Sequence, residues 1–475
     1  MAQPSYNFGE NERIKVILGL EQKYPVHEWS INGIDLWPVI RTYLYVELWV
    51  EHERSKKTTS HQPQPHAKSP NVAGGISLQQ RIVYLRDYVK FRLTPLKKSK
   101  ALFASAPGYI ENYKGKTLHR FFDPLRITKP EYRNAYIAFA SKHALEGIEQ
   151  QIPLGSFDYV QNLFARYYRK KGFSCHLSGF DAFCEELQRY SPIGKRLTIA
   201  FLQEAVTSIE KHAFIFKTIL KKTHAKEAIS LCYYLDSKAF FGLNLAAHRL
   251  GITSIDIQHG GQGNHHLAYG QFYKVPASGS YALLPSVFWC WDKASAESIR
   301  QWSSMDGVKH HAEVIDHPWL QFLASTTDAP PQLKPVVVYS LQPFQTLILP
   351  QVINAMKVLG AEYSWILRLH PNMQSRATEL KTLLEDEQVM PFIHPMTFDP
   401  LSLPETLAIA SIHLTRTSGT AIESALMGVP TILLDKEGAA MYSSFIHEGI
   451  AMDGSHADGE ALAETIRTRA RAGKR

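Results

Sequence analysis

Hydroxyl and glycine residues follow an apolar run within residues 411–435, SIHLTRTSGTAIESALMGVPTILLD. The pattern predicts a strand that turns into a short helix ended by Gly428. Free N–H groups at a helix start, joined by the hydroxyls of Ser418 and Thr420, suit an anion such as a phosphate. Glycine lets a ligand approach the backbone, and an acid one turn later is placed to accept from ribose hydroxyls. The predicted nucleotide-binding residues here are Arg416, Ser418, Gly419, Thr420 and Glu423. The alternative is a capped helix in an ordinary βαβ unit.

A histidine–proline pair ends an earlier apolar run, in the sequence Arg368-Leu369-His370-Pro371. Proline stops a strand, which leaves His370 at the carboxyl edge of a sheet, where open α/β folds bind ligands. Arg368 and His370 are therefore predicted to contact a phosphate or a nucleotide. The alternative is a histidine that only closes its strand; the neighbouring Ser-Gly-Thr turn favours the binding role.

Glycines and histidines follow a third apolar run in the segment SIDIQHGGQGNHHLAYG, residues 254–270. The glycines permit a tight loop that a ligand can approach, and histidines titrate near neutrality. His259 is predicted to be a base, a phosphate contact or a carboxylate contact. Gln258, His265 and His266 are predicted to contact the acceptor or the donor. No spacing typical of a metal site accompanies these histidines, so no metal is predicted.

A single carboxylate, Asp236, ends the apolar run SLCYYLD at residues 230–236. Aspartate is a favoured helix N-cap, which is the structural alternative. The functional alternative is a carboxylate at the sheet edge beside the His259 loop, acting as base or nucleophile. The two alternatives stay open.

Strands and helices must alternate to place these residues at sheet edges. Short apolar runs alternate with helical patterns from residue 101 onward, which is the rhythm of a parallel sheet. A proline-rich stretch at 326–334 separates two such series. The fold class is therefore α/β, with two Rossmann-like domains facing a cleft and extra N-terminal helices. Residues 131–225 are expected to be mostly helical. The predicted strands are 101–106, 230–236, 254–258, 286–291, 335–340, 363–369, 390–394, 411–415 and 430–435.

The predicted domain boundaries follow the composition. Residues 1–75 are expected to form an N-terminal helix and a mobile linker, because 51–75 are polar and rich in proline and glycine. Residues 76–325 form the acceptor-side domain and 335–475 the nucleotide-sugar-binding domain.

Residues 76–100 predict a basic amphipathic helix. Leu78, Ile82, Leu85, Val89 and Leu93 keep helical spacing, and seven Lys or Arg residues accompany one acid, Asp87. Such a helix can lie on an anionic membrane surface. The alternative is a helix packed on the protein with its charges in water. The basic C-terminus, EALAETIRTRARAGKR, is expected to add to membrane attraction.

Composition narrows the function classes. The chain has 475 residues, a net charge of +8 and ordinary globular proportions, so disorder throughout, collagen and coiled coil are excluded. Four separated cysteines and the N-terminal sequence favour a reducing cytosol. The modest basic excess favours phosphate-bearing small molecules or membranes; without a nucleic-acid signature, no nucleic-acid partner is predicted.

At these motifs the chain resembles GT-B glycosyltransferases. More narrowly, it resembles the bacterial capsule and lipopolysaccharide transferases with a Gln-His-Gly motif, which include β-Kdo transferases that use CMP-Kdo. One departure is Asp316-His317, where the family often has Gly-Asn. The segments that carry the resemblance are INGIDLWPVIR (31–41), IDIQHG (255–260), SVFWCWD (286–292), EVIDHPWL (313–320), RLHP (368–371) and TSGTAIESALMG (417–428).

The resemblance implies a transferase without cofactor or metal. Its expected partners are a nucleotide-sugar donor, with CMP-Kdo or a similar sugar favoured, and a glycan or glycolipid acceptor. Asp236 and His259 are the implied catalytic residues, for either an inverting or a retaining reaction. The expected location is the inner face of the cytoplasmic membrane, as a peripheral protein. The alternatives are a CDP-alditol phosphotransferase of teichoic-acid type, a non-hydrolysing sugar-nucleotide epimerase and a non-catalytic polysaccharide-assembly protein.

Overall fold

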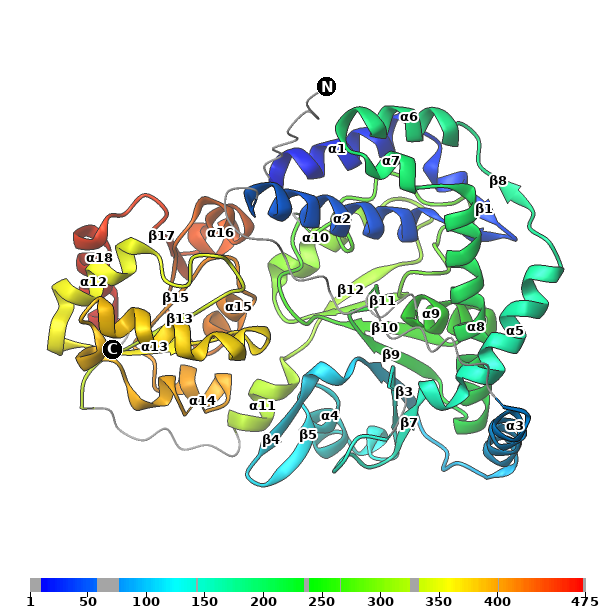
Figure 1. The fold of residues 1–475 in the computed structure, drawn as a ribbon, viewed down its shortest axis with the longest axis horizontal. Coiled ribbons are helices and arrows are strands. Elements are labelled where there is room, and N and C mark those ends of the chain that lie inside the picture. Colours follow the sequence, from blue (N-terminus) through cyan, green and yellow to red (C-terminus); the bar gives the residue numbers. More distant parts are fainter. Residues whose placement is uncertain are drawn as a thin grey trace. The chain divides into compact units, whose positions relative to one another are not determined.

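The structure, a computed structural model, describes residues 10–57, 77–141, 144–234, 239–264, 266–324, 333–399 and 401–472 (Figure 1). Its contacts divide the chain into two units. Unit 1 comprises residues 1–258 and 262–315, and unit 2 comprises 259–261 and 316–475. Each described helix is too short or too polar to cross a membrane.

Unit 1 is built on a seven-stranded parallel sheet with the order β12-β11-β10-β9-β3-β6-β7. Most strands are buried apolar runs, as expected when helices cover both faces of a parallel sheet. The strands are β3 (Ala101–Ser105), β6 (Tyr136–Phe139), β7 (Gln151–Pro153), β9 (Glu227–Leu231), β10 (Thr253–Ile257), β11 (Val287–Cys290) and β12 (His311–Val314).

Helices and two small antiparallel sheets surround this sheet (Figure 1). The small sheets are β2-β1-β8, from β1 (Ser30–Ile31), β2 (Ile34–Asp35) and β8 (Cys175–His176), and β4-β5, from β4 (Ile110–Tyr113) and β5 (Lys116–His119). The helices are α1 (Glu10–Lys23), α2 (Trp37–Lys57), α3 (Leu78–Leu93), α4 (Phe122–Thr128), α5 (Asp158–Lys170), α6 (Phe180–Tyr190), α7 (Ile193–Arg196), α8 (Ile199–Thr223), α9 (Ala239–Leu250) and α10 (Lys293–Ser303).

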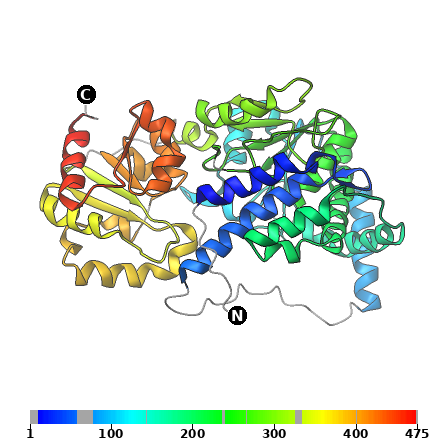
Figure 2. The same cartoon turned by 90° about the horizontal axis from the view of Figure 1, so that it is seen from above.

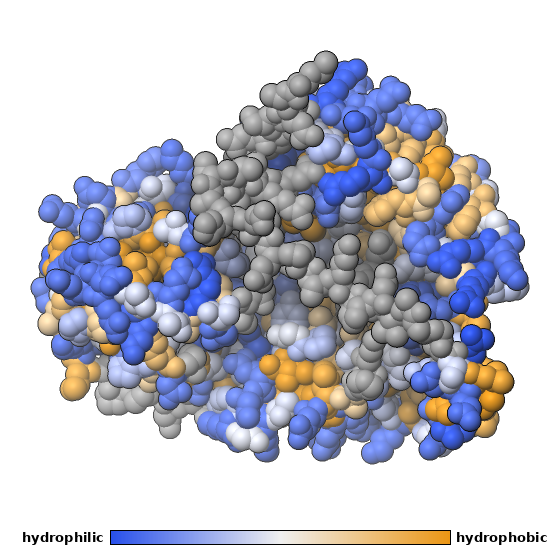
Figure 3. All heavy atoms as spheres, in the orientation of Figure 1, coloured by the Kyte–Doolittle hydropathy of each residue, from blue (hydrophilic) through white to orange (hydrophobic). Residues whose placement is uncertain are grey.

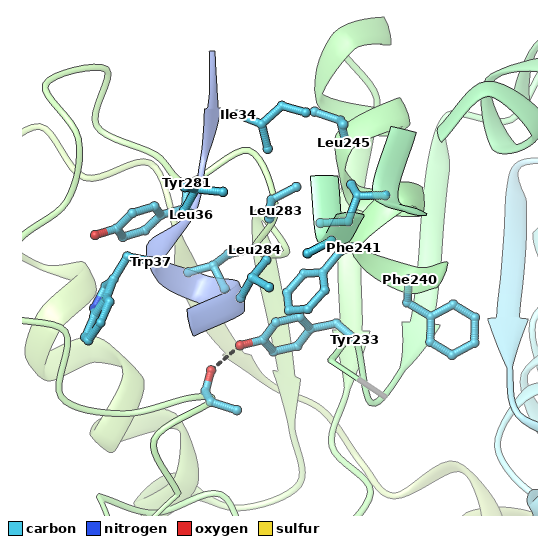
Figure 4. Packing of buried hydrophobic residues seen from close by; sticks show 14 of the residues in the cluster. Ile34, Leu36, Trp37, Tyr233, Phe240, Phe241, Leu245, Tyr281, Leu283 and Leu284 are labelled. Atoms are coloured by element: carbon cyan, nitrogen blue, oxygen red, sulfur yellow. Dashed lines mark hydrogen bonds between the residues drawn. The ribbon is translucent and has the colours of Figure 1, made fainter. Parts of the chain in front are cut away.

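The N-terminal elements are part of the core of unit 1. Trp37 at the start of α2 is fully buried and belongs to the same apolar cluster as the sheet residues. Figure 4 shows side chains from the β2–α2 segment beside Tyr233, Phe241 and Leu284. The hydroxyl of Tyr233 donates to the carbonyl oxygen of Ala268 within this cluster (Figure 4). Residues 26–50 therefore belong to the folded body of unit 1.

Unit 2 has its own five-stranded parallel sheet, in the order β14-β13-β15-β16-β17. The strands are β13 (Val336–Ser340), β14 (Ser364–Arg368), β15 (Ile412–Thr415), β16 (Thr431–Leu433) and β17 (Ala451–Asp453). The helices are α11 (Pro318–Ala324), α12 (Pro350–Leu359), α13 (Ala377–Asp386), α14 (Leu403–Ala408), α15 (Thr420–Leu426), α16 (Lys436–Met441), α17 (Ser443–His447) and α18 (Gly459–Ala472).

The predicted α/β class with parallel sheets is confirmed, but several elements differ from prediction. Residues 390–394 are not a strand: Met390–Phe392 form a 3-10 turn, and Ile393 makes one isolated bridge to Trp365. The start of the predicted linker at 51–75 is wrong, because α2 continues to Lys57. The mostly helical region 131–225 also contributes two sheet strands, β6 and β7.

Candidate functional site

The order of strands in unit 2 reverses at β13. The chain runs from β13 to β14 on one side and then crosses to β15 on the other side. Ligands of open α/β sheets bind outside the carboxyl ends of the strands at such a switch point. The predicted turn Thr417–Thr420 follows β15 at this position. His370 follows β14, so the two predicted motifs flank β13 and do not lie on neighbouring strands.

Side chains from three other segments fix the turn after β15. The amide of Gln342, just beyond β13, donates to Thr417 Oγ1 and accepts from Thr417 N, both at 2.8 Å. Asp435 accepts from Arg416 Nε at 2.7 Å, and the hydroxyl of Tyr442 donates to the Ser418 carbonyl at 2.9 Å. The turn is therefore held in one conformation before any ligand arrives.

A second feature makes this turn compact. A Cβ atom on Gly438 would lie 1.9 Å from the Arg416 carbonyl oxygen, so only glycine fits there. The guanidinium of Arg416 also stacks 3.6 Å from the centre of the Phe344 ring. Because Arg416 is engaged by Asp435 and Phe344, its charge is partly neutralised within the protein.

Thr420 joins the turn to a buried histidine. The Thr420 hydroxyl lies 3.3 Å from His413 Nε2, which also lies 2.9 Å from Ser340 Oγ. His413 is fully buried, and burial lowers its pKa to about 3, so the imidazole is neutral. The neutral ring ties β13 and the start of α15 together through hydrogen bonds.

The carboxylate of Glu423 lies next to the side chain of His317. It is buried, and its Oε1 lies 3.5 Å from Nε2 of His317, which is also buried. The predicted contact with ribose hydroxyls stays a prediction. The observed neighbour, His317, comes from the Asp-His pair at which the sequence departs from the family pattern.

Arg368 and His370 lie at the carboxyl end of β14, as predicted. Arg368 donates to the Leu401 carbonyl at 2.5 Å and lies 3.4 Å from Thr406 Oγ1, so it anchors the segment before α14. His370 is half-buried, and burial lowers its pKa. His370 is thus a partly exposed side chain at the strand end whose neutral form is favoured by burial.

Unit 1 has a switch point of its own, between β3 and β9. The chain passes from β3 to β6 and β7 on one side, then to β9 on the other. The segment Ala106-Pro107-Gly108-Tyr109 follows β3 directly at this edge. Sequence reasoning missed this segment, although a Pro-Gly pair after a buried strand was the available signal.

Asp256 on β10 is a buried carboxylate that the sequence prediction also missed. Its oxygens accept hydrogen bonds from Ser230 Oγ and Tyr233 N at 2.9 Å and from Tyr269 OH at 3.0 Å. Burial outweighs these bonds and raises its pKa to about 7. It holds the turn after β9, where Cys232 has a left-handed φ of 62°.

The catalytic aspartate of the prediction, Asp236, lies outside the described residues, as does His265. One premise for Asp236 is wrong, however. The strand β9 ends at Leu231, so the run 230–236 is not a single strand. Asp236 therefore follows the strand by five residues (236 − 231), with the left-handed turn at Cys232 between them.

The side-chain amide of Gln258, at the end of β10, forms hydrogen bonds with other protein groups. Its amide accepts from Trp291 N at 2.6 Å and donates to Asp292 Oδ2 at 3.2 Å and Ser295 Oγ at 3.0 Å. Gln258 is fully buried, so the structure gives it a positioning role. It fixes the point at which the chain leaves β10 for the His259 loop.

His259 and His266 differ in their surroundings. Burial lowers the pKa of His259 to about 4, so its ring is neutral at neutral pH. His266 Nε2 lies 2.9 Å from Tyr234 OH, and its ring packs against those of Tyr45 and Tyr269 at 4.9 and 5.0 Å. His266 is thus half-buried in an aromatic cluster of unit 1.

The segment 31–41 contacts the end of the same loop. Its last residue, Arg41, is fully buried and donates to the carbonyls of Gly270 and Gln271 at 2.9 and 2.8 Å. Glu21 lies 3.4 Å from Arg41 and accepts from Tyr273 N at 3.1 Å. The family-like motif therefore acts by holding the end of the glycine–histidine loop.

A cavity of about 380 Å³ lies within unit 2. His317, whose partner is Glu423, is on its wall, together with α14 and the end of α15. The cavity is mostly apolar and lies at the carboxyl end of α15, where His317 links it to Glu423. Its lining residues are Asp316, His317, Leu320, Gln321, Leu323, Pro404, Glu405, Ala408, Leu426 and Met427.

The predicted residues therefore gather in two places. Arg416, Ser418, Gly419 and Thr420 form one turn in unit 2, with His370 across β13. Gln258 and His266 belong to unit 1, and His259 is grouped with unit 2. Within the described part of the chain, no group of three His, Cys, Asp or Glu side chains is arranged to hold a metal ion.

No protein-family model matches the sequence, and no curated protein does. Among solved structures, the chain is similar to S. aureus MnaA in a co-structure with UDP, at 10% identity over 78% of this chain and 87% of that one, with a TM-score of 0.43. It is similar to the wall teichoic acid polymerase TagF at 13% identity, over 93% and 90%, with a TM-score of 0.43. The calicheamicin glycosyltransferase CalG4 has 13% identity, over 80% and 94%, with a TM-score of 0.38. These likenesses are distant, and the α/β class rests on the strands and helices themselves.

Proposed function

We propose that the chain is a glycosyltransferase of GT-B organisation that binds a nucleotide-activated sugar in unit 2. The observation that carries this proposal is the pre-formed turn Thr417–Thr420 at the switch point of a parallel sheet. Glycine and hydroxyl groups there offer donors without requiring rearrangement on binding. Pre-organised donors are the means by which an enzyme stabilises charge that develops on a leaving phosphate.

The favoured donor is CMP-Kdo or a similar CMP-activated sugar, and the favoured acceptor is a surface polysaccharide or a lipid-linked glycan. The support is the sequence resemblance at the Gln-His-Gly, RLHP and Ser-Gly-Thr motifs. Transfer of an alditol phosphate from a CDP-alditol and a non-catalytic assembly role are the rivals. Donor and product analysis separates these three functions.

The nucleotide site is tested by calorimetric titration of the full chain with CMP, CDP, UDP and GDP. We expect binding of CMP that Ser418→Ala combined with Thr420→Val weakens by about a hundredfold or more, since each of the two lost hydrogen bonds to a charged group is worth roughly 1.5–3 kcal/mol. Ser443→Ala with Thr468→Val, on α17 and α18, is the matched control. Unchanged affinity in the site variant rejects the site. Binding of UDP or GDP without CMP rejects the favoured donor.

Asp236 and His259 are the proposed catalytic residues. A neutral His259 offers a hydrogen-bonding nitrogen, whereas a carboxylate can act as base or nucleophile. Asp236→Asn is expected to lower sugar transfer by orders of magnitude while leaving CMP affinity and the melting temperature nearly unchanged, because asparagine caps a helix about as well as aspartate. Near-normal transfer by Asp236→Asn would show that Asp236 is a helix cap, and no transfer from any donor by the wild type would favour the assembly role.

A further inference from the structure

The helix α3 carries an apolar stripe that the described part of unit 1 leaves exposed. Leu78, Ile82, Leu85, Val89 and Leu93 recur at helical spacing and therefore share one face. Their exposed fractions are 73, 57, 41, 51 and 78%. Single exposed apolar side chains are common, but a contiguous stripe usually marks a binding surface.

A different face of the same helix packs onto the protein. Phe91 and Tyr88 contact Phe157, with ring centroids 4.8 and 6.2 Å apart, and Tyr84 lies 6.0 Å from Tyr159. The aromatic face thus holds α3 on the segment that leads into α5. The aliphatic stripe faces away from this contact, and Figure 2 shows α3, in light blue, standing out from unit 1.

Both ends of α3 are fixed, so the stripe is presented by an ordered helix. Ser77 and Gln80 form a capping box at its start. At its end, Lys222 Nζ donates to the carbonyls of Arg92 and Thr94 at 2.9 and 2.8 Å. Figure 3 shows hydrophobic side chains gathered where Figure 1 places α3, at the lower right.

Basic residues border the stripe on both sides. From the helical period, Arg81 and Arg92 lie along one border and Arg86 and Lys90 along the other. All four are exposed, and Asp87, on the side away from the stripe, is the one acid of the helix. Long basic side chains beside an apolar stripe can reach lipid headgroups while the stripe enters the acyl boundary.

The basic helix at the end of the described residues, α18, provides an internal comparison. α18 also carries several arginines, but its apolar residues Leu462 and Ile466 are buried in the core of unit 2. Arg467 is paired there with Glu362 at 3.5 Å. Of these two helices, α3 is the one that combines an exposed apolar stripe with bordering basic side chains, of which Arg86 also pairs with Asp87 at 3.1 Å.

From this arrangement we infer that α3 is a docking helix for an anionic lipid surface, with the stripe Leu78, Ile82, Leu85, Val89 and Leu93 inserted and the bordering arginines and lysine on the headgroups. This inference concerns attachment of unit 1 and is independent of the donor proposed for unit 2. The helix α18 is not a second membrane anchor in this inference, because its apolar residues are buried in unit 2.

The test is co-sedimentation of the full chain with phosphatidylcholine vesicles, with and without phosphatidylglycerol, across a salt series. Binding is expected to require the anionic lipid and to weaken as the salt concentration rises. Each basic side chain at the anionic surface contributes about fivefold to the affinity at low salt. Ile82→Ser with Val89→Ser should weaken it by about tenfold or more, because burial of aliphatic side chains is lost. Arg86→Gln with Lys90→Gln should weaken it by a similar factor at low salt.

Matched controls come from exposed residues outside α3. Ile127→Ser with Val358→Ser removes comparable apolar side chains, which are 56 and 41% exposed, and Lys217→Gln with Lys381→Gln removes two exposed charges. These controls should bind like the wild type, and all variants should keep the wild-type unfolding midpoint. Equal binding to neutral and anionic vesicles, no binding, or full binding by the stripe variant would each overturn the inference. Self-association lost in the stripe variant, without vesicle binding, would assign the stripe to a second copy of the chain.

Discussion

At the scale of single residues, buried and half-buried polar side chains order the segments that lead to the site. Asp256 gathers Ser230, Tyr233 and Tyr269 around one carboxyl group, and Gln342 does the same for the turn after β15. A buried polar group is costly when its hydrogen bonds are missing. Each of these residues therefore specifies one conformation of a loop that the apolar core alone would leave open.

Asp256 makes the stability of unit 1 depend on pH in a defined direction. Its pKa is raised from an ordinary value of 3.8 to about 7, because burial disfavours the charged form. The folded state thus binds the proton more tightly, and the associated stability is lost as pH rises from about 4 to 7. The full change in the free energy of unfolding is on the order of 4 kcal/mol.

Asp256→Asn should remove this dependence, because an amide does not titrate. The urea concentration at the unfolding midpoint is expected to fall for the wild type, relative to Asp256→Asn, as the pH rises from 5 to 7. Asp306→Asn, at an exposed position, is the control for net charge. A midpoint difference that stays constant with pH would contradict the raised pKa.

At the scale of elements, close approach of helices determines where small residues are needed. α8 and α9 meet at Gly242, where an added Cβ would lie 2.8 Å from the Ile209 carbonyl oxygen and 2.9 Å from Ala213 N. Those are backbone atoms of the facing helix, so they cannot move aside independently. Gly19 in α1 has nothing within 4 Å of the same position.

Gly242→Ala is therefore expected to destabilise the protein although alanine is the better helix former. Overpacking typically costs about 1–3 kcal/mol, against a propensity gain of about 1 kcal/mol. Gly19→Ala, the matched control, should gain stability by up to about 1 kcal/mol. Chemical unfolding of both variants measures the two signs; a stabilised Gly242→Ala would show that the helices separate freely.

At the scale of the whole molecule, each unit has its own main apolar core among the described residues, beside a smaller cluster in unit 2. One cluster draws on residues 14–312 and includes the N-terminal helices, and the other draws on residues 337–470. Each core closes over its own parallel sheet. Multidomain chains of this kind commonly unfold in steps, since cooperativity follows contiguous packing.

Calorimetry of the full chain should accordingly resolve two unfolding transitions. Gly242→Ala is expected to lower one of them, which belongs to unit 1, and CMP to raise the other, by about 2.7 kcal/mol at a hundredfold excess over Kd. The same experiment on Ser443→Ala with Thr468→Val should reproduce the wild-type response. A single transition shifted by both the variant and the nucleotide would contradict independent units.

The sequence by itself determined the elements whose signals are local. Short apolar runs predicted β3, β10, β13 and β15, because a strand covered on both faces is mostly apolar along its length. A glycine after the helical pattern predicted the helix end at Gly428, which has a left-handed φ of 70°. The stripe of α3 was also visible as helical spacing, since periodicity needs no knowledge of the partner.

Only the tertiary structure decided features that depend on distant segments. Periodicity could not say whether the α3 stripe is covered, and it is the aromatic face that packs. The reversal of strand order at β13 and at β3 arises from the crossovers, which leave no local signal. The roles of Asp256 and Gln342 depend on partners up to 26 and 75 residues away. Local chemistry thus fixed the kinds of residues at the sheet edges, and long-range hydrogen bonding fixed which of them position the loops.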